Sequence, residues 1–496
     1  MNKKIKALII GGAVLVVLIG VLVTLLLLNQ DSGGESSGSS TASSINLLEK
    51  NINDVTMLTV KNSKGEIVMH QSEDNTFTVE GLKDLPTDQS TVKEAFSSMA
   101  VIDATKVVSE SPEKLDEYGL ETPRATVQAT MKDGSTHTLK VGVQSPLKDG
   151  YYGMLEGDSK LYLFKTIPYA DFCTVSSKDY LAKTLIANTD GKEVEELVQK
   201  ISLYRSDIGH EIVFEQLEND KEQHYSPMYA SAFVMTAPVK AYVDSTYFGD
   251  VSDDATSFSA TSVVSVFPSE EQLKEYGFDN PSAIYTVDRK DGTRIQIKVG
   301  KACYSDPTTD DKAGTSITGY YVQLVGRDAV YYIKEAQMPF MTISVFDIIS
   351  QISFAPDITT LDTLTVSAEG KEYVIDFTQT KVDTKVNNSG IEVTGTINGK
   401  SVDKDRLANF YIFVVSGLAN EIYTGTPSGS PLLTLNFKFN DASLAPLEVT
   451  FHDVGDRKAS ITINGETRFT TRLSYVNAFF ENMKAIAQDK DINLNY

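Results

Sequence analysis

Serine and lysine residues occur in this sequence at spacings that hydrolytic enzymes use. Residues 34–38 fit the G-x-S-x-G pattern of a nucleophile elbow, but they lie in a Ser/Gly-rich stretch rather than between a strand and a helix. Residues 90–93 and 401–404 fit S-x-x-K of the penicillin-binding enzymes, without the S-D-N and K-T-G motifs that would complete that site. Ser90 and Ser401 stand where a helix is expected to start, so helix capping explains both. No residue is therefore assigned a catalytic role.

Metal-binding and cofactor-binding patterns are also missing from the sequence. The five histidines are scattered, with no i,i+4 pair and no acidic partner at ligand spacing. The acidic loop from Asp306 to Gly314 could bind Ca²⁺ weakly, but it lacks the alternating ligands of an EF-hand, which favours a solvated loop. Neither a phosphate-binding loop nor a dinucleotide fingerprint occurs. We expect no metal-binding residue, no cofactor-binding residue and no cofactor.

Two further groups of residues leave alternatives open. The pairs Tyr320-Tyr321 and Tyr331-Tyr332 could form a platform for a carbohydrate or a peptide, although aromatic residues in strands more often belong to a core. Cys173 and Cys303 are the only cysteines, and they could form one disulfide. Free thiols are favoured, because a chain this poor in cysteine is not built like a disulfide-rich secreted domain.

Size and charge limit the classes of function. The chain has 496 residues, of which 41% are hydrophobic and 23% are charged, so it can form several globular domains. Its formal net charge is −22 at pH 7. Such a field repels nucleic acids and anionic lipid headgroups and favours cationic partners. A nucleic-acid partner is therefore not expected.

An uncharged apolar run near the N-terminus predicts a membrane anchor. It extends from Ala7 to Leu28, and about 20 such residues span the hydrocarbon core of a bilayer. Three lysines precede the run and an acidic, Ser/Gly-rich stretch follows it, so the positive-inside rule places the N-terminus in the cytoplasm. A cleaved signal peptide would have a shorter apolar region and a small-residue cleavage site, which is missing here. We expect a single-pass protein of the cell membrane whose bulk is extracytoplasmic.

Internal repeats organise the remainder of the chain. Residues 115–142 align with residues 273–300 at a constant offset (273 − 115 = 158), and both copies carry Tyr-Gly, Pro, Asp-Gly and Val-Gly in register. A hairpin pattern that begins at Gly65 recurs at Gly209 and Gly370. The expected organisation is a cytoplasmic tip and anchor at 1–30, a Ser/Gly-rich tether at 31–44, and three repeats at 45–190, 191–352 and 353–496, the last one divergent.

The shared residues have roles in folding. Ser111 with Pro112 predicts the start of a helix, and Ser269 with Gln272 predicts a capping box in the second copy. The glycine that follows is expected to end the helix in the left-handed conformation, with an apolar contact after it and a proline that blocks continuation. The structural motif consists of Tyr118, Gly119, Leu120 and Pro123, and of Tyr276, Gly277, Phe278 and Pro281.

Periodicity predicts the fold class. The segments around each Asp-Gly pair alternate apolar and polar residues, which is typical of half-buried antiparallel hairpins. Amphipathic stretches at 91–99 and 406–418 are expected to supply one helix per copy. The predicted fold is therefore α+β: one N-terminal transmembrane helix followed by tandem repeats of a module of antiparallel hairpins with short capped helices.

This pattern resembles the domain-of-unknown-function family 4340, whose members carry an N-terminal anchor and a Tyr-Gly-Leu-x-x-Pro core. The family pattern continues with a strand, a turn, a Val-Gly strand end and a Tyr-Tyr strand, here Gly142 and Tyr151-Tyr152. The chain has no tryptophan, and Phe77 is expected to replace the one that members often carry in the early hairpin. The resemblance implies a bacterial envelope protein, often encoded beside an ABC transporter of the gliding-motility type. It implies no known reaction and no catalytic residues.

We expect a non-enzymatic, membrane-anchored binding or scaffold protein that is accessory to an ABC-type transporter or an envelope complex. Its expected partners are the bilayer, through the N-terminal helix, and permease subunits of such a transporter. The alternatives are an adhesin or structural spacer on the cell surface, and an envelope enzyme that modifies a wall polymer. Tandem modules on a tether would suit a spacer, whereas an enzyme would need a clustered acid/base pair that the sequence does not show.

Overall fold

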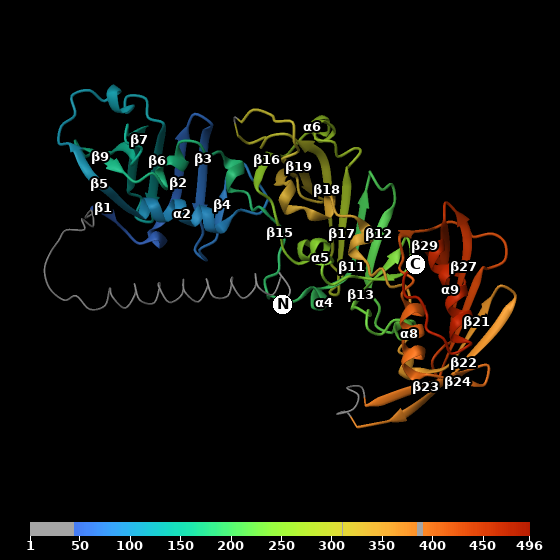
Figure 1. The fold of residues 1–496 in the computed structure, drawn as a ribbon. Helices are drawn as coiled ribbons and strands as arrows, with labels where there is room; N and C mark the ends of the chain where they lie inside the picture. Colours follow the sequence, from blue (N-terminus) through green and yellow to red (C-terminus); the bar gives the residue numbers. More distant parts are fainter. Residues whose placement is uncertain (1–43, 310, 384–389) are drawn as a thin grey trace. The chain divides into compact units, whose positions relative to one another are not determined.

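The structure is a computed structural model that describes residues 44–309, 311–383 and 390–496 (Figure 1). The expected anchor, with its ends Ala7 and Leu28, and nearly all of the tether lie outside the described residues. Across the described ranges, no helix is both long enough and apolar enough to cross a membrane. The described residues form two compact units, 44–63 with 95–174, and 64–94 with 175–496.

The predicted α+β fold is wrong, because the described chain is mostly β-sheet. Three nine-stranded sheets and one two-stranded sheet make up most of its regular secondary structure. The two expected helices are present as α2 (Gln89–Ala100) and α8 (Lys404–Val415), and α9 (Leu473–Ile486) is the only other described helix of more than eight residues. The physical reason is that tight turns join the period-two segments directly, so each segment adds a strand to a sheet. In the predicted α+β module, helices would have occupied more of these positions.

The first sheet has its strands in the following order: β1 (Ile45–Glu49), β5 (Val101–Ser109), β9 (Leu161–Phe164), β8 (Tyr151–Leu155), β7 (Thr136–Gln144), β6 (Ala125–Met131), β2 (Val55–Asn62), β3 (Gly65–Gln71) and β4 (Phe77–Val79).

The second sheet has the order β14 (Ala241–Tyr242), β13 (Phe233–Ala237), β12 (Glu211–Gln216), β11 (Val198–Arg205), β17 (Ala283–Arg289), β18 (Arg294–Cys303), β19 (Gly319–Leu324), β20 (Ala329–Lys334) and β16 (Ser262–Val266). Beside it, a two-stranded sheet pairs β10 (Thr184–Ile186) with β15 (Phe258–Ser259).

The third sheet has the order β24 (Lys400–Val402), β23 (Ile391–Ile397), β22 (Lys371–Lys381), β21 (Leu361–Ala368), β26 (Leu433–Phe439), β27 (Leu447–Gly455), β28 (Lys458–Ile463), β29 (Glu466–Arg472) and β25 (Glu421–Ile422).

The three large sheets share one connectivity over eight consecutive strand positions. The first reads β5-β9-β8-β7-β6-β2-β3-β4, the second β16-β20-β19-β18-β17-β11-β12-β13, and the third β25-β29-β28-β27-β26-β21-β22-β23. The hairpin after the Tyr-Gly motif (β6–β7 and β17–β18) therefore corresponds to β26–β27 in the third sheet, where the motif itself is missing. The boundaries given above for the repeats stay a prediction.

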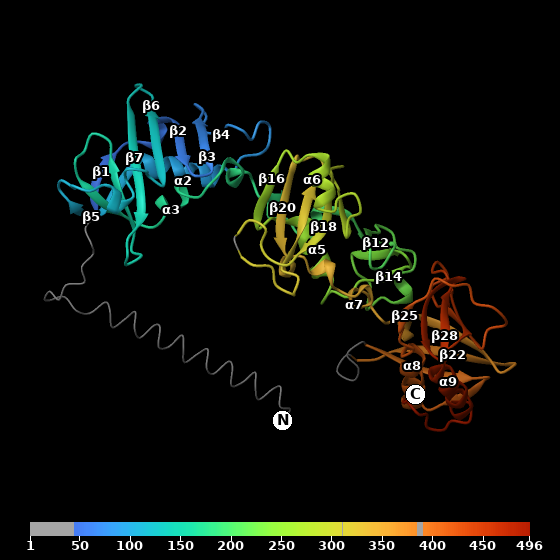
Figure 2. The ribbon, with the colours of Figure 1, turned by 90° about the horizontal axis from the view of Figure 1, so that it is seen from above.

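Alternating burial explains why these segments form strands. In β6, which forms a long hairpin with β7 (Figure 2), the side chains of Val127, Ala129 and Met131 are buried and alternate with half-buried polar ones. Asp133 closes the turn by accepting hydrogen bonds from Ser135, and Gly134 has a φ of 81°. The period-two prediction and the Asp-Gly turn are thus both confirmed in this hairpin.

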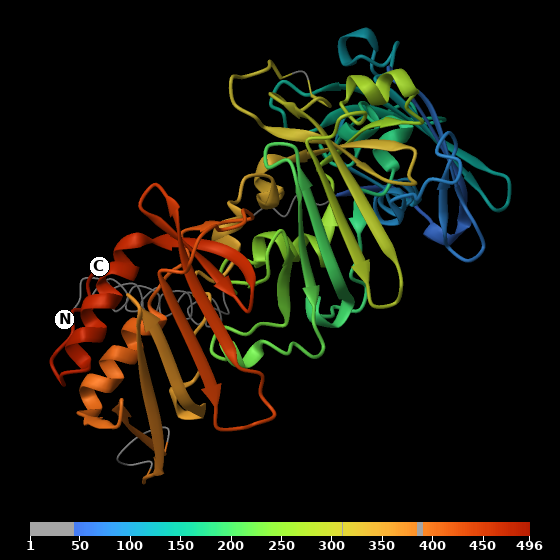
Figure 3. The same cartoon turned by 90° about the vertical axis from the view of Figure 1, so that its right-hand side faces the viewer.

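The third sheet carries two helices side by side, α8 and α9 (Figures 1 and 3). Phe479 of α9 contacts Phe410 and Phe413 of α8, with ring centroids 5.8 and 5.7 Å apart. The buried hydroxyl of Tyr475 donates to the carbonyl oxygen of Val414 at 2.6 Å. The third sheet therefore has a large aromatic core of its own, although its sequence has diverged from the other two.

Candidate functional site

The glycines of the structural motif adopt the backbone conformation predicted for them. Gly119 has a φ of 67° and follows the 3-10 turn Asp116–Tyr118, and Gly277 has a φ of 89° after α6 (Glu270–Glu275). The capping box is confirmed, since Ser269 and Gln272 exchange hydrogen bonds between side chain and backbone. The prediction that a helix starts at Ser111 is wrong, because the segment forms only a single 3-10 turn, Asp116–Tyr118.

The Tyr-Gly and Val-Gly parts of the motif belong to one packing unit in each copy. A Cβ atom added to Gly142 would lie 2.1 Å from the carbonyl oxygen of Tyr118, and one added to Gly300 would lie 2.2 Å from that of Tyr276. The ring of Tyr118 packs edge-on against Tyr152 at 5.0 Å between centroids. In the second copy, the ring of Tyr276 packs against that of Tyr321, with 4.7 Å between the ring centroids. The motif therefore fixes the fold and offers no exposed chemistry.

The other motif residues take ordinary positions in the same structure. Leu120 and Phe278 are buried, as expected for the apolar contact after the glycine. Pro123 and Pro281 each lie just before the strand that follows, β6 and β17. These residues stabilise the entry to each central hairpin.

The serines of the two S-x-x-K matches do not cap their helices. Asp88 accepts hydrogen bonds from the backbone N–H groups of Ser90 and Thr91, both at 3.1 Å, and therefore caps α2. Asp403 caps α8 in the same way. The capping role assigned to Ser90 and Ser401 is thus wrong by two residues in each case: Asp88 precedes Ser90, whereas Asp403 follows Ser401, which lies in β24.

The remaining sequence candidates lie apart from one another. Cys173 and Cys303 are free and buried, and burial raises the pKa of each thiol to about 11, which makes both poor nucleophiles. Tyr320, Tyr331 and Tyr332 are core residues, which favours the structural interpretation of the tyrosine pairs. Within the described ranges, no group of three or more possible ligands is placed to hold a metal ion.

The structure instead reveals a groove that the sequence did not indicate. Its volume is about 1070 Å³, and three segments and Leu418 line it: residues 228–231, residues 243–250 and residues 342–352. We call it the acidic groove. Its walls carry exposed Met228, Tyr229 and Tyr247.

Charged residues in the acidic groove are all of one sign. Asp244, Asp250 and Asp347 line it, and its described lining contains no lysine, arginine or histidine. None of the three aspartates forms an ion pair with a described residue. Asp244 shapes the turn by accepting from the backbone N–H of Thr246 at 2.8 Å. The groove therefore concentrates negative potential beside apolar side chains.

One wall of the acidic groove is a loop that distinguishes the second sheet. Residues 217–232 join β12 to β13, whereas residues 72–76 suffice to join β3 to β4 at the equivalent position of the first sheet. Ser231 ties the end of this loop to the groove floor, since its hydroxyl accepts from the N–H of Val243 at 3.2 Å. A long loop that is held in place by a scaffold is a common location for binding residues.

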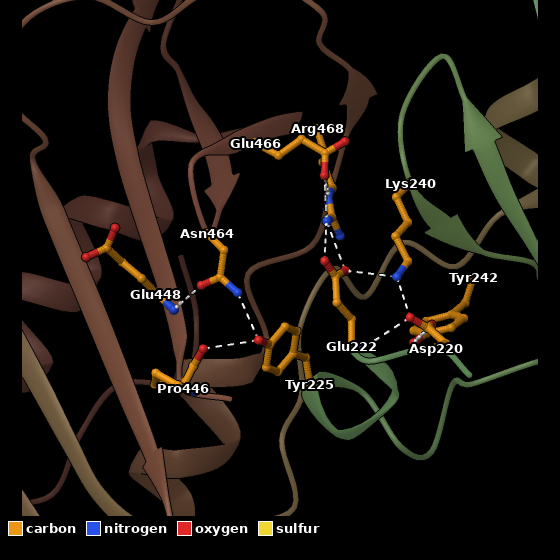
Figure 4. Close-up of polar contacts among 10 residues, drawn as sticks. All are labelled: Asp220, Glu222, Tyr225, Lys240, Tyr242, Pro446, Glu448, Asn464, Glu466 and Arg468. Carbon is orange, nitrogen blue, oxygen red and sulfur yellow. Dashed lines mark hydrogen bonds and ion pairs between the residues drawn. The ribbon is translucent and has the colours of Figure 1, made fainter. Parts of the chain in front are cut away.

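A network of charged residues holds the same loop from behind (Figure 4). Asp220 accepts hydrogen bonds from Lys240 and Tyr242, each at 2.5 Å. Oε2 of Glu222 lies 3.2 Å from Nζ of Lys240 and 2.9 Å from Nη2 of Arg468 in β29. Burial alone would raise the pKa of Asp220, but the hydrogen bonds from Lys240 and Tyr242 lower it below its ordinary value. The loop is therefore fastened in part by the carboxylate of Asp220, which stays ionised at neutral pH.

Further hydrogen bonds from Tyr225 and His224 complete this attachment. The hydroxyl of Tyr225 donates to the carbonyl oxygen of Pro446 at 3.1 Å and accepts from the side-chain amide of Asn464 at 2.9 Å (Figure 4). His224 makes a hydrogen bond of 2.8 Å with the carbonyl oxygen of Ala445 and packs on Phe439. Polar contacts to the third sheet thus keep the loop beside the acidic groove.

Replacing Arg468 by methionine is expected to lower the free energy of unfolding by about 2–3 kcal/mol, because the buried guanidinium pairs with Glu222 and Glu466. Arg294→Met is the matched control, since Arg294 pairs with Asp288 at an exposed position and should cost less than about 1 kcal/mol. Denaturant titration of both variants provides the comparison. Equal losses would contradict the structural role of Arg468.

Comparison with known proteins adds one finding. The family model described as Domain of unknown function (DUF4340) matches residues 78–281 and 234–407, which together cover 78–407. Each match begins in one of two equivalent strands, β4 or β13, and runs into the next sheet along the chain. Neither the comparison with curated proteins nor that with solved structures gave a match.

Proposed function

This chain belongs to the family described as Domain of unknown function (DUF4340), and from that premise we propose that it is a membrane-anchored binding or scaffold protein. In this proposal, the apolar run from Ala7 to Leu28 holds the chain in the cell membrane with its sheets on the extracytoplasmic side. The partner is a protein of the envelope, with a permease subunit of an ABC-type transporter as the first candidate. The transporter is what the family resemblance implies.

The acidic groove is the observation that carries this proposal. Its volume of about 1070 Å³ is slightly above the range of small-molecule sites, which is about 300–1,000 Å³. The exposed side chains of Met228, Tyr229 and Tyr247 line it. Tyrosine and methionine are enriched where proteins bind one another.

Site-specific photo-crosslinking tests the proposal in the membrane. A photoreactive phenylalanine analogue in place of Tyr229 in the acidic groove should capture one defined envelope protein. The same analogue in place of Tyr304, which is similarly exposed on the second sheet but does not line the groove, should not capture it.

The identity of any captured protein follows from mass spectrometry of the crosslinked band. Absence of a specific product from Tyr229, or the same products from both positions, would contradict a binding role for the groove. That outcome would favour the alternative of a structural spacer, for which three sheets of one connectivity in tandem suffice.

A further inference from the structure

We propose, building on the function proposed above, that the acidic groove takes a cationic segment of the partner protein in which lysine or arginine alternates with aliphatic or aromatic residues. This inference specifies the chemistry of the ligand. It rests on the proposed function only in that a protein occupies the groove.

Charge complementarity favours a cationic ligand. Asp244, Asp250 and Asp347 face the groove without a cationic neighbour in its described lining. A second hollow, which α5 (Gly249–Thr256) also lines, shares Asp250 and adds Asp253 and Asp254, again without a lysine or arginine among its described lining residues. A cationic ligand would neutralise carboxylates that the described chain leaves unpaired, whereas an anionic one would be repelled.

The apolar side chains argue for a peptide over a small cation. Met228 is 86% exposed, Tyr247 is 49% exposed and Leu418 is 40% exposed, so each offers apolar surface that water now covers. A polyamine or a metal ion would leave that surface uncovered, and the described residues provide no ligand cluster for a metal. A segment in which apolar and basic side chains alternate would cover the apolar side chains and pair with the aspartates of the groove.

The backbone at the floor of the groove is already hydrogen-bonded. The floor is the chain that continues β14: Asp244 donates its N–H to the carbonyl oxygen of Ile348 at 2.7 Å, and Ser350 donates to that of Tyr242 at 2.8 Å. The backbone groups at the floor are therefore already paired with each other. Recognition must come from side chains, that is, from the carboxylates and the apolar groups.

The experiment measures binding of labelled peptides to the full-length chain in detergent by fluorescence anisotropy. The probes are Lys-Leu-Lys-Tyr-Lys-Leu-Lys and its acidic counterpart Glu-Leu-Glu-Tyr-Glu-Leu-Glu, with spermine as a competitor. The groove variant combines Asp244→Asn, Asp250→Asn and Asp347→Asn. The control variant combines Glu211→Gln, Glu275→Gln and Asp279→Asn, which remove the same charge from the second repeat outside the groove.

The basic peptide should bind the wild type and the control variant alike, and the groove variant about tenfold more weakly at low salt, with the difference shrinking at high salt. Tyr247→Ser should also weaken binding, because the proposed segment packs an apolar side chain on this ring. If charge alone held the peptide, this change would have no effect. Equal weakening in the control variant, equal binding of the acidic peptide, or displacement by spermine at the peptide's own concentration would overturn the inference.

Failure of this inference is distinguishable from failure of the proposed function. If the photo-crosslink at Tyr229 still captures a defined protein while the peptides show no charge preference, only the cationic assignment falls. If no protein is captured at Tyr229, the binding function falls, whatever the peptides do.

Discussion

Replacing Gly300 by alanine is expected to destabilise the second sheet by about 3 kcal/mol or more. The added Cβ would lie 2.2 Å from the carbonyl oxygen of Tyr276, which is a backbone atom and cannot rotate away. That oxygen also accepts from the N–H of Lys301 at 2.8 Å, so any shift breaks a hydrogen bond. Overpacking usually costs about 1–3 kcal/mol, and a clash with backbone lies at the upper end or beyond.

Gly292→Ala is the control for this change, because it lies in the same hairpin with a φ of 89° and has open space around its Cβ position. It should cost only about 1 kcal/mol, the strain of a side chain at positive φ. Hydrogen exchange of the β17 and β18 amides reports the stability of this sheet without requiring the whole chain to unfold in two states. Similar loss of protection in both variants would contradict the close approach of Gly300 to Tyr276.

Replacing Asp254 by asparagine is expected to stabilise the protein at pH 8 and to leave its stability unchanged at pH 4. Burial, with a smaller contribution from the charge of Asp253, raises the pKa of Asp254 from 3.8 to about 7. Below pH 4 the carboxyl is protonated in both the folded and the unfolded chain. Between pH 4 and 7 the unfolded chain loses this proton first, so stability falls as pH rises, and the full cost is present above pH 7.

The size of this effect follows from the same pKa difference. A shift from 3.8 to about 7 corresponds to at most about 4 kcal/mol, and relaxation of the site reduces it to about 2–4 kcal/mol. Denaturant titrations of the wild type and Asp254→Asn across pH 4–8 should diverge by that amount. Asp250→Asn, an exposed change on the same helix, is the control. Parallel pH profiles for wild type and Asp254→Asn would show that Asp254 is ordinarily solvated.

Local features of the fold could be predicted because neighbouring residues determine them. Positive φ at Gly119 and Gly277, the capping box at Ser269 and the Asp-Gly turns all depend on a few consecutive residues. The width of the sheets could not, because a strand such as β11 pairs with β17, a partner about eighty residues further along the chain. The α+β prediction failed for that reason: period-two segments specify strands but not how many align in one sheet.

The acidic groove could not be predicted because it depends on tertiary contacts. Asp244 and Asp347 are about one hundred residues apart, and they meet because β14 continues into a chain that pairs with residues 348–350. The network behind the groove joins Glu222 to Arg468 across an even longer stretch. One signal was present in the sequence: the link after the Gly209 hairpin, residues 217–232, is longer than its counterpart at residues 72–76.

Affinity purification of the intact chain from detergent-solubilised membranes tests the binding function most directly. The wild type is compared with a groove variant, Tyr229→Ala with Tyr247→Ala, and with a control variant, Tyr304→Ala with Val325→Ala, in which both replaced side chains are exposed outside the groove. The account predicts that wild type and control recover the same envelope protein, a transporter permease as first candidate, and that the groove variant recovers about tenfold less. Recovery of that protein in equal amounts by all three chains, or by none, would contradict it.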